Sequence, residues 1–339
     1  MRKLLNTLYV TVEGAYLAKD GETVAVRIEH ETRMQLPVHT LEGIVCFGQV
    51  SMSPALMGFC AEKRVGVSFL TEHGRFLARV QGPANGNVLL RREQYRRADD
   101  LEASGRIAQA VLMGKIANTR TALLRAAREH PAEPLDEAAL QLAQSLRAAE
   151  RESSLDALRG IEGDAASCYF AVFNHMIAAQ QQGFTFHERS RRPPLDNVNA
   201  LLSFVYVLLA HDVAAALETV GLDPAVGFLH RDRPGRASLA LDLMEELRPV
   251  LADRLVLSLI NRRQVAADGF TRSESGGVLM GDATRKEVLV AWQKRKQEEI
   301  EHPFLGERIP FGLVPYAQSL LLARCLRGDL DAYPAFFWR

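Results

Sequence analysis

The chain has 339 residues, of which 47% are hydrophobic and 24% are charged, and its 41 basic residues balance its 41 acidic ones. This composition is that of an ordinary soluble globular protein, and the length allows about two domains. The equal numbers of basic and acidic residues exclude a strongly basic or strongly acidic protein. A neutral total neither requires nor excludes nucleic acid, because binding needs only a local basic patch.

The four cysteines are scattered along the chain and form no C-x-x-C pair. This spacing argues against a zinc ribbon, an iron–sulfur cluster or a disulfide framework, and it fits the reducing cytoplasm. The N-terminal stretch MRKLLNTLYVTVEG lacks the cleavage site of a signal peptide. The longest apolar run, at 201–210, is half the length that spans a bilayer, so we expect a buried helix and no membrane partner.

The first ninety residues show the pattern of short strands. Residues 15–29 form two strand-like runs around Asp20-Gly21, which predicts a hairpin, and a further turn is expected at His73-Gly74. Ser53 followed by Pro54 predicts the start of one short helix. These signals favour a small β-rich domain.

The spacing of apolar residues becomes helical after the turn-rich stretch GPANGN, residues 82–87, which we interpret as a linker. Apolar residues then recur at steps of three and four over 101–128 and again over 135–150, and Gly328 is a candidate cap of the last helix. The predicted fold class is therefore α+β. A β-rich domain over 1–85 precedes a larger all-helical domain over 86–339.

A group of acids follows a lone histidine in HRDRPGRASLALDLMEE, residues 230–246. A helix capped by Ser238 would place Asp242, Glu245 and Glu246 on one side, with His230 just upstream. Like charges four residues apart destabilise a helix by a few tenths of a kcal/mol, and no Lys or Arg stands four residues after Asp242 or Glu245. Either this face is solvated, or it holds a cation such as Mg²⁺ or Mn²⁺, which carboxylates and an imidazole would suit.

A second acid, Glu162, lies between two glycines in LRGIEGDAASCYF, residues 158–170. Gly160 and Gly163 each cost up to ~1 kcal/mol relative to alanine inside a helix. They would let a backbone or a ligand approach Glu162 closely, or they would mark a helix join beside an exposed glutamate. Tyr169 could stack on a nucleobase or belong to the core.

Arginines gather in two loops, and they could bind phosphate groups or only keep the loops solvated. The candidates are Arg189, Arg191, Arg192, Arg231, Arg233 and Arg236. Asp196 is expected to cap the helix that follows the first loop, and a further basic run at 285–296 is expected on an exposed helix. The chain has no P-loop, no G-x-G-x-x-G after a strand and no G-x-S-x-G, which argues against nucleotide hydrolysis, dinucleotide chemistry and esterase activity.

Several of these stretches together resemble the CRISPR-associated Cas1 integrase family. They are SPALMGFCAEKRVGVSFL, LRGIEGDAASCYF, RRPPLDNVNALLSFVYVLL, GLDPAVGFLHRDRPGRASLALDLMEELRP and LINRR, in this order. The closing LLARCLRGDLDAYPAFFW is most similar to the variant of type I-C systems. The resemblance covers nearly the whole chain.

The resemblance implies an N-terminal β-sandwich that pairs with its copy in a homodimer, joined to a helical catalytic domain. It also implies that Glu162, His230 and Glu245 hold Mg²⁺ or Mn²⁺, with Asp242 as an auxiliary catalytic acid. Many members of the family have aspartate where this chain has Glu245. The six arginines named above would then bind DNA phosphates.

The activity implied by the resemblance is a metal-dependent DNA endonuclease and integrase of the cytoplasm. It would insert foreign DNA fragments, or spacers, into a CRISPR array by 3′-hydroxyl attack on a repeat phosphodiester. The implied partners are double-stranded DNA, a Cas2 protein and a Cas4 nuclease. Two alternatives stay open: a stand-alone structure-selective metal-dependent DNase, and a non-catalytic DNA-binding scaffold.

Overall fold

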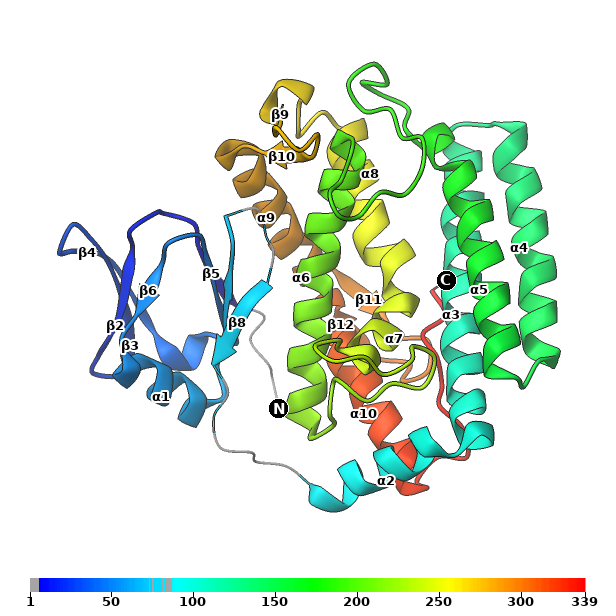
Figure 1. The fold of residues 1–339 in the computed structure, drawn as a ribbon, viewed down its shortest axis with the longest axis horizontal. Helices are drawn as coiled ribbons and strands as arrows, with labels where there is room; N and C mark the ends of the chain where they lie inside the picture. Colours follow the sequence, from blue (N-terminus) through cyan, green and yellow to red (C-terminus); the bar gives the residue numbers. More distant parts are fainter. Residues whose placement is uncertain (1–5, 73, 75, 81, 83–86, 339) are drawn as a thin grey trace. The chain divides into compact units, whose positions relative to one another are not determined.

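The computed structural model describes residues 6–72, 74, 76–80, 82 and 87–338. The chain divides into two compact units. The first consists of Met1–Asn85 together with Trp292–Gln297, and the second of Gly86–Ala291 together with Glu298–Arg339 (Figure 1). Among the described residues, the first unit carries strands, a short helix and the end of a second helix, and the second unit is mainly helical, so the fold class is α+β as predicted.

The first unit contains two four-stranded sheets. One sheet has the order β1 (Thr7–Val10), β5 (Gly43–Phe47), β7 (Gly66–Leu70) and β8 (Phe76–Val80). The other has the order β4 (Glu31–Pro37), β3 (Thr23–Ile28), β2 (Tyr16–Asp20) and β6 (Ser51–Met52). The hairpin predicted at Asp20-Gly21 is confirmed, because β2 pairs antiparallel with β3 and Gly21 adopts φ +57° in the turn.

A single apolar cluster joins both sheets to the helix α1 (Pro54–Lys63). It includes Leu17 and Val24 of one sheet, Ile44 of the other, and Leu56 of the helix, all fully buried. The predicted cap of α1 is confirmed, because the Ser53 hydroxyl accepts a hydrogen bond from the Leu56 amide. The turn expected at His73-Gly74 and the linker at 82–87 lie largely outside the described residues.

Most of the second unit consists of helices. They are α2 (Val88–Asp99), α3 (Leu101–Glu129), α4 (Glu133–Arg151), α5 (Leu155–Ala171), α6 (Asn197–Val220), α7 (Ser238–Leu247), α8 (Arg254–Asn261) and α10 (Val314–Arg327). A π-helical turn, Arg248–Asp253, separates α7 from α8, and Gly328 caps α10 as predicted, at φ +80°. Helix α9 (Asp282–Gln297) has its last six residues in the first unit.

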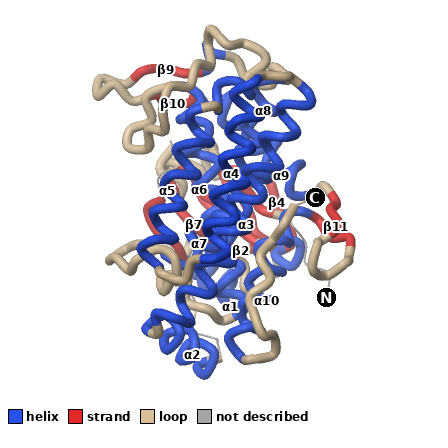
Figure 2. Tube along the Cα trace, turned by 90° about the vertical axis from the view of Figure 1, so that its right-hand side faces the viewer, coloured by secondary structure: helices blue, strands red, loops and turns tan. Residues whose placement is uncertain are grey.

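The expectation of an all-helical second domain is wrong in one respect. Two small antiparallel ribbons interrupt the helices: β9 (Phe270–Arg272) with β10 (Val278–Met280), and β11 (Glu299–Glu301) with β12 (Arg308–Pro310). Gly276 and Gly306 adopt positive φ in the two connecting turns, a conformation that glycine reaches without steric cost. In Figures 1 and 2 the β9–β10 ribbon lies near one end of α6 and α8.

The apolar run at 201–210 lies within α6, and the expectation of a buried helix is confirmed. Among the described residues, α6 is long and apolar enough to cross a membrane, with a mean hydropathy of 1.9, but 56% of that window is buried inside the protein. Leu201, Leu202 and Val205 are fully buried. Asp196 caps the helix as predicted by accepting a hydrogen bond from the Asn199 amide.

The basic run at 285–296 does not lie on a wholly exposed helix. Arg285 and Lys296 of α9 are buried, at 6% and 3% exposure, and Arg285 pairs with Asp282 one turn earlier. Lys286 and Lys294 are exposed. The expectation of an exposed helix therefore holds for only part of this run.

Candidate active site

Helix α7 carries the acids that the sequence singled out. Ser238 is its first helical residue rather than its cap, since the preceding residue holds the cap position and no side chain completes it. The Ser238 hydroxyl instead donates to the carbonyl of Arg231 at 3.2 Å. The predicted cap is therefore wrong, and the serine closes the loop that leads to the helix.

The interpretation of this helix face as solvated is also wrong. Asp242, Glu245 and Glu246 are exposed by only 1%, 1% and 0%. A buried carboxylate is costly unless it is hydrogen-bonded or paired with a cation. Each of the three acids has its own partners, drawn from distant parts of the chain.

Asp242 holds the loop that carries His230. Its carboxylate accepts the backbone amides of Phe228 at 2.6 Å, Leu229 at 3.0 Å and His230 at 2.9 Å. It also lies 2.7 Å from Nδ1 of the His230 ring. A carboxylate accepts hydrogen bonds, so in this contact Nδ1 of the ring donates to Asp242 and Nε2 points away from it.

Gly227 makes this arrangement possible. A Cβ at that position would stand 2.8 Å from the Asp242 carboxylate and 2.8 Å from the backbone of Ser238. A larger residue would push the loop away from α7. The sequence GFLHRDRPG therefore folds against the helix because a glycine precedes the three amides that Asp242 binds.

Two cations and the ring of His230 lie around Glu245. One carboxylate oxygen, Oε1, lies 2.5 Å from the guanidinium of Arg248, and Nε2 of His230 is 4.0 Å away from the same oxygen. The other oxygen lies 2.8 Å from Nζ of Lys115, a distance for an ion pair, although its angle is not that of a good hydrogen bond. Burial by itself would raise the pKa of Glu245, but Arg248, Lys115 and His230 outweigh it and lower the pKa to about 2.

Lys115 links Glu245 to the second predicted acid. Its ammonium, on α3, pairs with Oε1 of Glu162 on α5 as well as with Glu245 on α7. The side chain of Lys115 is 11% exposed and that of Glu162 is 32% exposed, so the pair is open to solvent on the side of α5. The structure thus brings Glu162, His230 and Glu245 to one place.

Sequence reasoning missed both cations of this cluster. Arg248 stands three residues after Glu245, a spacing that also places two side chains on one helix face. Lys115 falls three and four residues after Leu112 and Val111, which are buried. A lysine on the apolar face of a predicted helix was therefore a signal, but nothing in the sequence indicated its partners.

The glycines beside Glu162 do not serve close packing within the protein. Apart from the adjacent residues and the backbone of α5 itself, no atom of the described residues comes within 4 Å of a Cβ placed on Gly160 or Gly163, and α5 continues through both without a break. Both the close backbone approach and the helix join are therefore wrong, and open space lies next to Glu162. Tyr169 is a core residue, 4% exposed, and its hydroxyl donates to Asp253 at 3.1 Å.

The predicted arginines fall into different environments. Arg191, Arg192 and Arg233 are exposed, and Arg236 is partly exposed. Arg231 is exposed but pairs with Asp156 at 2.8 Å. Arg189 does not join them, because its guanidinium donates to Asn199 at 2.6 Å and to Ser203 at 3.1 Å inside the protein.

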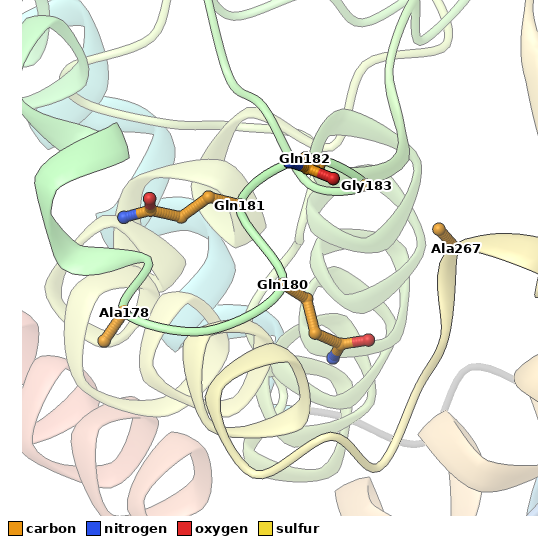
Figure 3. Close-up of a pocket in the computed structure, with 6 residues that line it drawn as sticks. All are labelled: Ala178, Gln180, Gln181, Gln182, Gly183 and Ala267. Carbon is orange, nitrogen blue, oxygen red and sulfur yellow. The ribbon is translucent and has the colours of Figure 1, made fainter.

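Two hollows in the described part of the second unit differ in the chemistry of their lining. A small cavity of about 40 Å³ adjoins the acid cluster and is lined by Lys115, Glu162, Arg191 and Arg248 among others. A larger, open hollow of about 410 Å³ lies between the loop Ala178–Gly183 and Ala267 (Figure 3). Its lining side chains are alanines and glutamines, which carry no titratable group, so we assign the chemistry to the first place.

Comparison with known proteins identifies the family. The family model described as CRISPR associated protein Cas1 matches residues 8–294. The chain belongs to the Cas1 family. It is 54% identical over 343 residues to the CRISPR-associated endonuclease Cas1 1 of Chlorobaculum tepidum, and 55% identical over 348 residues to the CRISPR-associated endonuclease Cas1 2 of Rhodospirillum rubrum, with full coverage of all chains. Both relatives are named as endonucleases, and the match extends over their whole length.

Solved structures share the fold of this Cas1 family member. A casposase bound to an integration product has a TM-score of 0.85 at 21% identity, with 98% of this chain and 94% of that chain covered. A Cas1 protein from Thermotoga maritima has a TM-score of 0.82 at 24% identity, with 95% and 97% covered. At these identities the likeness concerns the fold.

Two further matches bear names that include other components. One is a chain of a Cas6-RT-Cas1–Cas2 complex, with a TM-score of 0.82 at 22% identity, 100% of this chain and 36% of that chain covered. The other is a Cas4/Cas1 fusion of Geobacter sulfurreducens, 36% identical over 337 residues, with 98% of this chain and 60% of the fusion covered. The Cas2 and Cas4 components in these names belong to those two proteins.

Proposed function

We propose that the chain is a divalent-metal-dependent DNA integrase and endonuclease. In this proposal the 3′-hydroxyl of a DNA fragment attacks a phosphodiester of a CRISPR repeat, and Glu162, His230 and Glu245 hold Mg²⁺ or Mn²⁺. The observation that carries the proposal is the meeting of Glu162 and Glu245 at one ammonium, Lys115, with His230 beside them. Two carboxylates from different helices already face a single positive charge there.

The donor set fits a hard divalent cation. Carboxylate oxygens and an imidazole nitrogen are ligands that Mg²⁺ and Mn²⁺ accept. Nε2 of His230 and Oε1 of Glu245 lie 4.0 Å apart. Asp242 binds the opposite nitrogen of the ring, which is the usual way in which a carboxylate orients a metal-binding histidine.

In the arrangement described, Lys115 occupies the place between the two carboxylates. Accordingly, no three His, Cys, Asp or Glu side chains of the described residues are gathered tightly enough to ligate one ion. A bound cation requires the ammonium to move aside by a rotation of its flexible side chain. Lys115 would then lie next to the bound phosphate instead of between the acids.

A divalent ion bound by these residues would stabilise negative charge on the phosphate and make the attacking hydroxyl or water more nucleophilic. Lys115 and Arg248 would add fixed positive charge where the phosphate becomes more negative during the reaction. The exposed Arg191, Arg192 and Arg233 would bind DNA phosphates with little reading of sequence. One phosphodiester is broken and another is formed, so strand joining requires no nucleotide hydrolysis.

The proposed partners are double-stranded DNA, a second copy of the chain, a Cas2 protein and a Cas4 nuclease. The Cas2-containing complex and the Cas4 fusion among the similar proteins support the last two. We further propose that the first unit is a β-sandwich that pairs with its copy, and that the chain is of type I-C. The four cysteines are all free, which supports a site of action in the reducing cytoplasm.

The test is a strand-joining assay with a labelled DNA fragment, a plasmid that carries the repeat, Mn²⁺, and the Cas2 partner. We expect Glu162→Gln to abolish joined and cleaved products while DNA binding remains, because the amide binds a cation far more weakly than a carboxylate. Glu150→Gln, which changes an exposed glutamate of α4, serves as the matched control and should react normally.

The alternatives give different products. A stand-alone DNase yields fragments without joined strands, and Glu162→Gln removes those fragments. A DNA-binding scaffold is unaffected by Glu162→Gln. Products that form equally well with EDTA in place of Mn²⁺ would reject the metal-dependent mechanism.

A further inference from the structure

Glu246 of α7 is bound by neutral hydrogen-bond donors, whereas the adjacent Glu245 contacts the cations of the site. Its Oε1 accepts the hydroxyl of Tyr333 at 2.7 Å, and its Oε2 accepts the amide of Phe336 at 2.6 Å and the side chain of Gln318 at 3.0 Å. Two of these three donors belong to the last segment of the chain, Tyr333–Trp338. The side chain of Glu246 therefore anchors this segment to α7.

The same segment is also anchored to α3. The amide group of Asn118 donates to the carbonyl of Phe336 at 2.7 Å and accepts from the amide of Trp338 at 2.7 Å. Asn118 donates as well to the backbone carbonyl of Glu246 at 2.7 Å. One asparagine therefore ties α3, α7 and the segment together, and it is fully buried.

Two further features hold the segment in place. Gly114 of α3 leaves room for it, because a Cβ there would stand 3.2 Å from both Ala335 and the side chain of Glu246. The ring of Trp338 lies 3.7 Å from the guanidinium of Arg125 and 4.5 Å from that of Arg254, which are favourable cation–π contacts. In Figure 1 the segment is the red trace that runs beside α7 and α3 to the C-terminus.

The anchors stand next in sequence to the residues of the candidate active site. Gly114 precedes Lys115 on α3, and Glu246 follows Glu245 on α7. Successive residues of a helix point about 100° apart. Helices α3 and α7 therefore each present one face to the segment and an adjacent face to the candidate active site. Helix α7 is short, and it passes into a π-helical turn at Arg248, three residues after Glu245.

We propose that Tyr333–Trp338 is a positioning strap that fixes α7 against α3 and thereby holds the carboxylate of Glu245 ready for the cation. The inference rests on the proposed function, because it assigns Glu245 to the metal site. Groups that orient a metal ligand from behind typically contribute 10- to 100-fold to metal affinity. The strap acts through Glu246 and touches neither cation nor DNA.

The experiment compares the affinity for Mn²⁺ of the full chain with that of three variants, by titration calorimetry. A chain that ends at Ala332 should bind Mn²⁺ on the order of 10- to 100-fold more weakly. Tyr333→Phe removes one hydroxyl that reaches Glu246 and should weaken binding by up to about 10-fold. Phe337→Ala changes an exposed side chain of the same segment, 39% exposed, and should bind as the full chain does.

Two additional measurements separate positioning from general stability. A peptide of residues 331–338 added to the shortened chain should restore the affinity for Mn²⁺. Hydrogen exchange in the absence of metal should show faster exchange of the α7 amides in the shortened chain, with those of α4 unchanged. If the shortened chain does not fold, the Mn²⁺ affinity of Tyr333→Phe decides the question, because the phenylalanine ring still fills the core.

The outcomes are distinct for the two proposals. Equal affinity for Mn²⁺ in the full chain and in Tyr333→Phe, with α7 exchange unchanged in the shortened chain, overturns the strap. If the full chain binds no Mn²⁺, the proposed metal site is wrong, and the proposed role of the strap is then wrong as well. Weaker binding in Phe337→Ala to the same extent as in Tyr333→Phe would also overturn the inference, because it would reveal an unspecific effect.

Discussion

Glu245 and Glu246 are the same residue type, adjacent on one helix and both buried, yet their surroundings differ in charge. Glu245 faces Lys115 and Arg248, while Glu246 faces the neutral donors Tyr333, Gln318 and the amide of Phe336. Burial raises the pKa of Glu246 to about 8, and its three hydrogen bonds offset this only in part. For Glu245 the nearby cations reverse the effect of burial, and its pKa is about 2.

This difference separates a carboxylate that can bind a cation from one that serves the architecture. Neutral hydrogen-bond donors satisfy a buried carboxyl group without keeping it charged, whereas a positive neighbour favours the charged form. Glu245 is therefore anionic throughout the physiological pH range, as a metal ligand must be. Burial shifts Glu246 towards its neutral form, and its side chain links the strap to the helix.

Removing the cation between the site acids should have the largest effect on stability. Lys115→Met leaves Glu245 buried with one of its two close cations, and breaking a buried ion pair from one side costs about 3–5 kcal/mol. We expect this loss in urea unfolding monitored by circular dichroism with EDTA present. Because a divalent ion replaces the missing positive charge, Mn²⁺ should recover a substantial part of the loss.

The matched control for this variant lies on the same helix. Arg106→Met removes an exposed pair with Glu102, whose side chains are 63% and 80% exposed, and it should cost less than about 1 kcal/mol. Unfolding of Lys115→Met at the urea concentration of the unaltered chain would show that Lys115 contributes nothing to Glu245. The contrast between Glu245 and Glu246 would then have no basis in charge.

The pH dependence of stability should distinguish the two glutamates next. The folded chain binds the proton of Glu246 more tightly than the unfolded chain, so stability falls as pH rises from about 4.5 to about 8. Asp253, whose pKa burial raises to about 6, adds a loss of the same sign at the acidic end of this window. Glu245 acts in the opposite sense, and its contribution is lost as pH falls from 4.5 towards 2.

Glu246→Gln removes the first of these terms. In urea unfolding of the metal-free protein at pH 5, 6, 7 and 8, its stability relative to the unaltered chain should rise with pH. The total rise should be on the order of a few kcal/mol. Parallel pH profiles of the two proteins would contradict the assignment of a proton to Glu246.

The sequence predicted the helices and strands well where the signal was local. The hairpin at Asp20-Gly21, the caps at Ser53, Asp196 and Gly328, and the buried helix α6 depend on neighbouring residues, and each is confirmed. The short β9–β10 and β11–β12 ribbons were missed because three residues are too few to show a period of two. The cap at Ser238 was wrong because its hydroxyl closes the preceding loop.

The candidate site was accessible to sequence reasoning only in part. The acids of α7 could be placed on one helix, but their burial could not be foreseen, because several of their partners come from α3, α10 and the last segment of the chain. The resemblance to a family supplied Glu162, His230 and Glu245 as a set, and the structure brings these three residues together. Lys115 lay outside both lines of reasoning, because only the folded chain brings α3 between α5 and α7.

The smallest predicted effect concerns the arginines, which carry the same charge but differ in exposure. Arg191 and Arg192 are exposed, whereas Arg189 donates to Asn199 and Ser203 within the protein, and burial lowers its pKa. Each phosphate contact contributes about −0.9 to the slope of log K against log salt for duplex DNA. Arg191→Ala with Arg192→Ala should therefore make the slope shallower by up to about 1.8, measured by fluorescence anisotropy across a salt series.

Arg189→Gln should lower the melting temperature and leave the slope unchanged, because its guanidinium is already engaged. A change of slope in Arg189→Gln that equals the change in the double variant would show that DNA binding does not distinguish exposed from internal arginines.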